Sequence, residues 1–159
     1  MCQNRVMFKQ FLQAGALTVL QPDACRLGGV NECLAVLLLA HKFGVPIVPH
    51  SGGVGLPEYT QHLSTIDYVV VSGKKSLLEY IDHLHEHFEN PAMVMDGYMV
   101  TPKEPGYSVQ MKPDSMDTYS FPGEEGKSWW KTPSARVVLD GPQLQGGLLS
   151  NTSNLISTI

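Results

Sequence analysis

The sequence has few charged residues and no long basic run. Charged residues make up 16% of its 159 residues, and 11 Lys and Arg stand against 15 Asp and Glu, which gives a net charge of -4. No run of basic residues is longer than Lys74-Lys75. Because proteins that bind nucleic acids usually carry a basic patch or stripe, the composition gives that function no electrostatic support.

Long apolar segments and a cysteine framework are also missing. The longest apolar run, residues 34–40, is far shorter than the roughly 20 residues that cross a bilayer, and residues 1–10 lack the apolar core of a secretion signal. The three cysteines are odd in number and have no CxxC spacing, so they indicate neither a disulfide framework nor a zinc site. We expect a soluble protein of a reducing compartment, with no membrane partner.

Two kinds of apolar pattern alternate along the first 90 residues. Three segments have the apolar spacing of helices: residues 4–14, 58–64 and 77–88. A fourth, residues 31–43, is almost continuously apolar and closes on Gly44, which indicates a helix packed against a sheet. Three short apolar runs are typical of buried strands: residues 17–20, 46–48 and 68–72. Strands that alternate with helices pair in parallel through right-handed crossovers. The pattern therefore predicts an α/β fold, either a doubly wound sheet or part of an eight-stranded barrel.

Asp23 and His50 follow directly after the first two of these predicted strands. They are 27 residues apart, close to the roughly 31 residues of one βα unit in a barrel, and the ends of neighbouring strands are about 4.8 Å apart. An Asp that accepts one ring N–H of a His leaves the other nitrogen for proton transfer. The spacing predicts an acid/base dyad; the alternative is an Asp that caps a loop and a His that lines a wall.

Two further patterns give weaker signals. The Gly-rich turn at residues 51–55 could offer N–H groups to an anion, but it lacks the order and the Lys of a phosphate loop, which disfavours a small domain that binds phosphorylated ligands. His83, His85 and His87 are spaced like metal ligands, although the solvated face of a helix explains them. We assign no chemistry to the cysteines.

Four motifs resemble the enolase superfamily, in its mandelate racemase-like branch and near L-fuconate dehydratases. They are QPDACRLGGVNE at residues 21–32, VPIVPHSGGVGLPE at 45–58, EYIDHLHEHF at 79–88 and PKEPGYSVQMK at 102–112. The resemblance covers about residues 2–125. It implies that Asp23 and His50 end the sixth and seventh barrel strands as a catalytic dyad, and that Glu79 is the acid that hydrogen-bonds the enolate intermediate.

The resemblance also implies a reaction and a cofactor. In the full-length family Mg²⁺ binds the carboxylate of an acid sugar, a base removes the α-proton, and the β-hydroxyl leaves as water. The metal-binding carboxylates and the Lys-x-Lys base lie on earlier strands that this sequence does not include, so no metal ligand is assigned. We expect an L-fuconate-like substrate and a chain that is inactive by itself, in a full-length protein that could form a homo-oligomer. The alternative is a non-catalytic product that binds full-length subunits.

The resemblance and the composition together divide the chain into three parts. Residues 1–90 are expected to form about three C-terminal βα units of a barrel, and residues 91–126 an irregular, family-like extension with short strands. Residues 127–159 show no sustained period and few charges, which predicts a loose or disordered tail. We expect a cytoplasmic location, or a mitochondrial one if a preceding segment carries a targeting signal.

Overall fold

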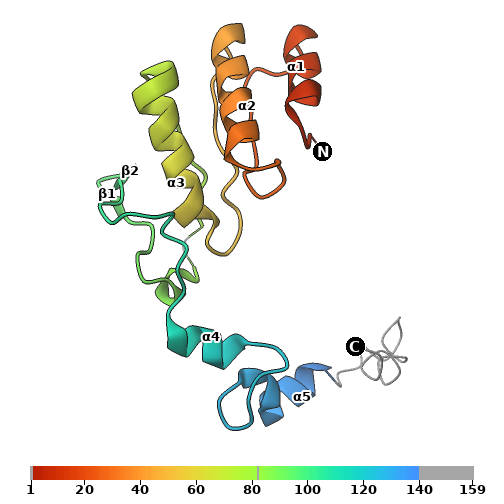
Figure 1. The fold of residues 1–159 in the computed structure, drawn as a ribbon, viewed down its shortest axis with the longest axis vertical. Coiled ribbons are helices and arrows are strands. Elements are labelled where there is room, and N and C mark those ends of the chain that lie inside the picture. Colours follow the sequence, from red (N-terminus) through yellow and green to blue (C-terminus); the bar gives the residue numbers. More distant parts are fainter. Residues whose placement is uncertain (1, 82, 140–159) are drawn as a thin grey trace. The chain divides into compact units, whose positions relative to one another are not determined.

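The computed structural model describes residues 2–81 and 83–139 (Figure 1). By its contacts the chain divides into two compact units, one within residues 1–110 and one within residues 111–159. Each unit is described by itself. Across the described ranges, no helix combines the length and the hydropathy needed to cross a bilayer.

Three helices of the first unit confirm three predicted ones. They are α1 (Arg5–Gln13), α2 (Val30–Phe43) and α3 (Leu56–Ile66), and α1 and α2 pack side by side (Figure 1). The side chain of Asn4 accepts the Met7 N–H at 3.0 Å and so begins α1. Gly44, at φ 69°, ends α2 in the left-handed conformation that suits glycine.

The two segments that precede Asp23 and His50 lie parallel to each other, as predicted. Leu20 and Ile47 form a parallel bridge. The Leu20 N–H donates to the Pro46 carbonyl at 2.9 Å, the Val48 N–H donates to the Leu20 carbonyl at 3.0 Å, and the His50 N–H donates to the Pro22 carbonyl at 2.9 Å. Because α2 connects the two segments, they form a βα unit followed by a second strand-like segment.

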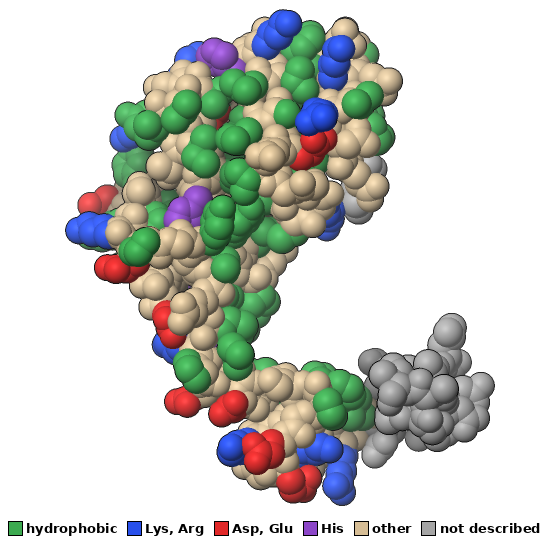
Figure 2. All heavy atoms as spheres, in the orientation of Figure 1, with side chains coloured by type: hydrophobic (Ala, Val, Ile, Leu, Met, Phe, Trp, Pro, Cys, Tyr) green, Lys and Arg blue, Asp and Glu red, His purple; other side chains and the backbone are tan. Residues whose placement is uncertain are grey.

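The core of the first unit lies between this pair of segments and the helices. It consists of buried apolar side chains from α1, α2, α3 and the two parallel segments: Phe8, Leu12, Leu20, Ala24, Leu27, Cys33, Val36, Leu37, Ala40, Ile47 and Leu63. Hydrophobic atoms also remain at the surface (Figure 2). The packing of α2 on both parallel segments fixes where their carboxyl ends lie.

The predicted strand at residues 68–72 is wrong. Residues Asp67–Ser72 form a π-helix that continues α3, and Val69 and Val70 are 70% and 74% exposed. β-branched residues favour strands mainly where they pair and are buried, and no described strand pairs with this run. Helical continuation satisfies the backbone instead, and the buried carboxylate of Asp67 accepts the Ser72 hydroxyl at 2.7 Å.

The predicted helix at residues 77–88 is also wrong. Among its described residues, 77–81 and 83–88, this segment contains a single 3-10 turn, His85–His87, and Leu84 has a φ of 66°, which a continuous helix does not allow. Leu77, which the helical pattern placed on an apolar face, is 76% exposed. Side-chain contacts of Glu79 and His85 with other parts of the unit, described below, take the place of helical hydrogen bonds.

Short strands follow residue 91, as predicted. β1 (Val94–Met95) and β2 (Tyr98–Met99) pair antiparallel. Asp96 and Gly97 join them, and both have positive φ, which is typical of a two-residue hairpin turn.

The second unit contains α4 (Pro113–Tyr119), a 3-10 turn (Trp129–Lys131) and α5 (Pro133–Leu139). The Trp130 indole N–H donates to the Tyr119 carbonyl at 2.9 Å, and its ring packs edge-on against Phe121 at 5.3 Å. Residues 129–131 and 133–139 are helical, where the sequence predicted a loose tail, because local caps and this aromatic contact do not show as a period. The rest of the predicted tail, residues 140–159, lies outside the described residues.

Candidate active site

The structure brings Asp23 and His50 together. The Nδ1 atom of His50 lies 3.1 Å from Oδ2 of Asp23, and the two side chains are 24% and 10% exposed. The alignment falls short of a linear hydrogen bond, but the buried Nδ1 has no other partner among the described residues. The parallel pairing of the preceding segments places both side chains at the same edge, as their spacing predicts.

Asp23 is fixed by further contacts. Its Oδ1 accepts the Cys25 N–H at 2.8 Å, and its Oδ2 lies 2.6 Å from Nη1 of Arg26. The guanidinium of Arg26 is half exposed. The sequence analysis missed Arg26, although its i, i+3 spacing from Asp23 was a usable signal. The carboxylate is thus oriented by two donors besides the ring of His50.

Glu79 lies on the other side of the His50 ring. Its Oε2 accepts the Ser51 N–H at 2.8 Å and lies 3.9 Å from Nε2 of His50. A side chain on Gly52 would place its Cβ 3.2 Å from this Nε2 and 3.6 Å from Oε1 of Glu79. The imidazole therefore lies between two carboxylates, and glycine at position 52 leaves room beside the nitrogen that faces Glu79.

The Gly-rich turn at residues 51–55 makes its contacts with other parts of this chain. Its first N–H, that of Ser51, is taken by Glu79 rather than left for a ligand, and the Gly53 N–H donates to the Ser51 carbonyl at 3.1 Å. Gly55, at φ 71°, packs against the ring of Phe88, where a Cβ would come within 2.9 Å of the ring. The predicted alternative of a phosphate site gains no support from these contacts.

His85 makes buried contacts, so a solvated helix face does not describe it. Its Nδ1 contacts the carboxylate of Glu58, which is 0% exposed, and its Nε2 lies 2.5 Å from the Ile81 carbonyl oxygen. Burial lowers the pKa of His85, but the hydrogen bonds to Glu58 and Ile81 raise it, and the net shift is upward. The sequence analysis missed Glu58, because an acidic residue at a helix start normally indicates an exposed position.

The described residues do not form a metal site. Within residues 2–81 and 83–139, no three His, Cys, Asp or Glu side chains gather as a possible metal-binding group. The two carboxylates of the site are separated by His50, and three of their four oxygens already contact Arg26 or a backbone N–H group. Mg²⁺ needs carboxylate oxygens that are free to coordinate it, so this set does not fit the ion.

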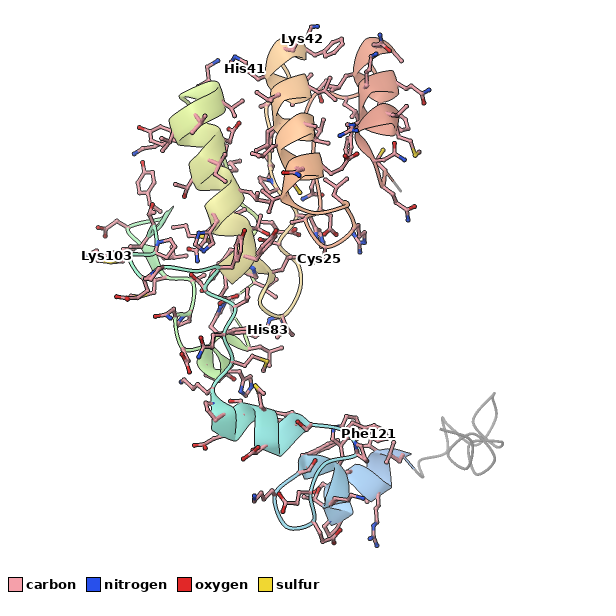
Figure 3. All side chains as sticks on the ribbon, viewed as in Figure 1. Cys25, His41, Lys42, His83, Lys103 and Phe121 are labelled. Carbon is pink, nitrogen blue, oxygen red and sulfur yellow. The ribbon has the colours of Figure 1, made fainter. Side chains whose placement is uncertain are left out.

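Cys25 and Cys33 lack the features of reactive thiols. Burial raises the pKa of the Cys25 thiol, and the charge of Asp23 raises it further; Figure 3 labels Cys25, which lies in the turn before α2. Burial likewise raises the pKa of Cys33. Since the thiolate is the nucleophile, neither side chain is primed for chemistry at neutral pH.

Replacing Asp23 with Ala is expected to reduce the population of the His50 tautomer that carries its proton on Nδ1. The substitution removes the acceptor that faces this nitrogen, and the partner of one ring nitrogen determines which tautomer forms. The ¹⁵N chemical shifts of the His50 ring report the ratio of tautomers. Asp114→Ala, in the other unit, is the matched control, and an unchanged ratio in Asp23→Ala would show that Asp23 does not orient the ring.

The chain is similar to a known protein family and to known proteins. The sequence model of a family described as "Enolase C-terminal domain-like" matches residues 1–115. An L-galactonate dehydratase of Hypocrea jecorina is 69% identical over 144 residues, which are 91% of this chain and 32% of that protein. The chain therefore spans about a third of the length of this curated relative.

Solved structures show the same fold. The crystal structure of human mitochondrial enolase superfamily member 1 matches with a TM-score of 0.74 and 53% identity, over 78% of this chain and 29% of that one. An L-talarate dehydratase from Polaromonas sp. JS666, complexed with Mg and L-glucarate, matches with a TM-score of 0.60 and 23% identity, over 72% of this chain and 28% of that one. These matches confirm the predicted fold class, part of an α/β barrel.

Proposed function

The chain belongs to the enolase C-terminal domain-like family, and on that premise we propose that it carries the acid/base part of an acid-sugar dehydratase site. The predicted resemblance to the enolase superfamily is confirmed, and the relatives lie in its acid-sugar dehydratase branch. One observation carries the proposal: His50 has Asp23 at Nδ1, while Gly52 leaves space at Nε2 beside Glu79.

Each of the three side chains has a proposed role. Dehydration of an acid sugar needs the α-proton to leave and the β-hydroxyl to take up a proton as it departs as water, and Nε2 of His50 is placed to carry out one of these transfers. Asp23 orients the ring through the contact at Nδ1. Glu79 donates a hydrogen bond to the enediolate oxygen when it is protonated.

Asp23, His50 and Glu79 are not proposed to bind the metal. In a complete enzyme of this kind Mg²⁺ would supply positive charge that stabilises the enediolate, held by residues other than those described here. The described residues do not fit the ion, so no step is assigned to it here. We therefore keep the expectation that the isolated chain does not catalyse the reaction.

The proposed substrate is a six-carbon aldonic acid of the L-galacto configuration. The resemblance in the sequence pointed to L-fuconate, and the Hypocrea jecorina relative is named for L-galactonate. The two acids share their configuration from C2 to C5, and L-fuconate lacks only the hydroxyl at C6. This broader class replaces L-fuconate alone, because a difference at C6 is remote from the α- and β-carbons that react.

This proposal is tested with a chimera in which residues 1–115 replace the matching segment of the Hypocrea jecorina relative. We expect Mg²⁺-dependent formation of a 2-keto-3-deoxy acid from L-galactonate, L-fuconate or both, measured by trapping the keto group. The isolated chain should give none under the same conditions. A folded chimera that turns over neither acid, beside an active parent enzyme, would refute the proposed function.

A second candidate is a non-catalytic product that binds full-length subunits. The observation that favours it is the set of exposed apolar side chains on the first unit, among them Val69, Val70 and Leu77. In a whole barrel such side chains would be expected to pack on further elements. Co-purification of the tagged chain with a full-length subunit would support this candidate, and a monomer that captures none would count against it.

We also propose a mitochondrial location, which the name of the human relative supports, with the cytoplasm as the alternative.

A further inference from the structure

A buried carboxylate lies close to the candidate site but outside the proposed chemistry. Glu58 is in the first turn of α3 and its side chain is 0% exposed. Its Oε1 contacts Nδ1 of His85 and accepts the Ala92 N–H at 3.1 Å. A buried carboxylate is costly unless it is paired and hydrogen-bonded. The partners of Glu58 therefore show what its burial contributes to the structure.

His85 uses both ring nitrogens in this arrangement. Nδ1 contacts the carboxylate of Glu58, and Nε2 lies 2.5 Å from the Ile81 carbonyl oxygen. Both partners are acceptors, and only the imidazolium form carries an N–H on each nitrogen. The ring also stacks on Tyr80, with centroids 5.1 Å apart and planes 7° from parallel. His85 therefore joins α3 to the backbone and the side chain of residues 80 and 81.

These contacts hold the residues that directly follow Glu79. Residues 79–81 lie in neither a helix nor a strand, so no regular backbone hydrogen bonds fix them. Glu79 itself is tied to the Ser51 N–H at 2.8 Å. Ser51 therefore holds this short segment directly, through Glu79, and Glu58 holds it indirectly, through the contacts of His85 with Tyr80 and Ile81.

We propose that Glu58 and His85 are positioning residues that hold residues 79–81 so that the carboxyl group of Glu79 stays beside His50. The functional meaning of this pair rests on the proposed function, because that proposal gives Glu79 its role. Neither Glu58 nor His85 touches the space at Nε2 of His50. The pair acts through Tyr80 and Ile81, which connect it to Glu79 along the chain.

The pair should respond to pH in a defined direction. The groups that face His85 are the carboxylates of Glu58 and Glu86, the ring of Tyr80 and the carbonyl of Ile81; His87 lies on Glu86 at 3.6 Å. The pKa of His85 is raised above its ordinary value, which is about 6.5. The pair is therefore complete at pH 6 and weakens as the pH rises through the folded value.

Nuclear magnetic resonance of the full chain tests the proposal without any substitution. Between pH 5.5 and 9 we expect the amide resonance of Ser51 to change with the same midpoint as the His85 ring resonances, because loss of the imidazolium loosens Glu79 and its hydrogen bond to Ser51. A Ser51 amide resonance that stays constant through the His85 transition would overturn the proposal.

Substitutions then separate the pair from its neighbours. At pH 6, Glu58→Gln should remove the part of the Ser51 amide chemical shift that the hydrogen bond to Glu79 produces. Glu86→Gln, which removes an exposed carboxylate next to His85, should leave this chemical shift unchanged. A folded Glu58→Gln chain with the wild-type Ser51 shift would contradict the proposal, and if this variant does not fold, the pH titration decides. Since the readout is a hydrogen bond, it can succeed or fail independently of dehydratase activity.

Discussion

His50→Asn in the chimera lowers kcat for dehydration by about two to four orders of magnitude, the range that general acid/base groups contribute. Asn retains a polar side chain but cannot exchange a proton at the place of Nε2. KM should change far less than kcat, because the proposed role of His50 lies in proton transfer rather than in ground-state binding. Initial rates with saturating acid sugar measure the effect.

The matched control for this substitution is His41→Asn. His41 lies in the last turn of α2 (Figure 3), at the opposite end of that helix from the turn that carries Asp23, and its side chain is exposed. We expect wild-type kcat for this variant. A His50→Asn chimera that is folded and retains more than about a tenth of the activity would show that His50 is not an acid/base residue.

His85→Leu destabilises the chain by about 3 kcal/mol at pH 6, the lower end of the cost of breaking a buried ion pair. The substitution leaves the Glu58 carboxylate, at 0% exposure, without its principal partner. Ala92 still donates one hydrogen bond to it, which is one reason to expect the lower value. Urea unfolding followed by circular dichroism measures the difference in free energy of unfolding.

The pH dependence of this difference has a definite sign. A group whose folded pKa is raised, as that of His85 is, adds stability fully below its unfolded pKa of about 6.5, and that contribution is lost as pH rises through the folded pKa. The gap between wild type and His85→Leu should therefore narrow from pH 6 to pH 9. His83→Leu, which changes an exposed neighbour, is the control. If both substitutions lowered the free energy of unfolding equally, the Glu58–His85 contact would not be the source of the effect.

The parts of the fold that sequence predicted well depend on local patterns. Helices α1 and α3 have clear apolar spacing, α2 is almost continuously apolar, and two of the three have a terminating residue that can be read directly, as with Gly44. Asp23 and His50 could be paired because one βα unit separates them and because parallel strands end at the same edge. The contact between them follows from this topology alone.

The errors occurred where tertiary contacts override the local pattern. Residues 68–72 have strand-forming side chains but no partner strand in the described part of the chain, so they continue a helix. Residues 77–88 have helical spacing, yet Glu79 and His85 bind Ser51 and Glu58 instead. The burial of Glu58 could not be predicted, since its partner is 27 residues away along the chain.

Chemical rescue shows directly whether Nε2 of His50 transfers a proton in dehydration, as we claim. His50→Ala in the chimera removes the ring and leaves a space beside Gly52 and Glu79. If Nε2 of His50 transfers the proton, added imidazole restores turnover of the acid sugar in proportion to the imidazole concentration. His41→Ala should need no rescue. A folded His50→Ala chimera that stays fully active without imidazole, or that imidazole never rescues, would contradict the claim.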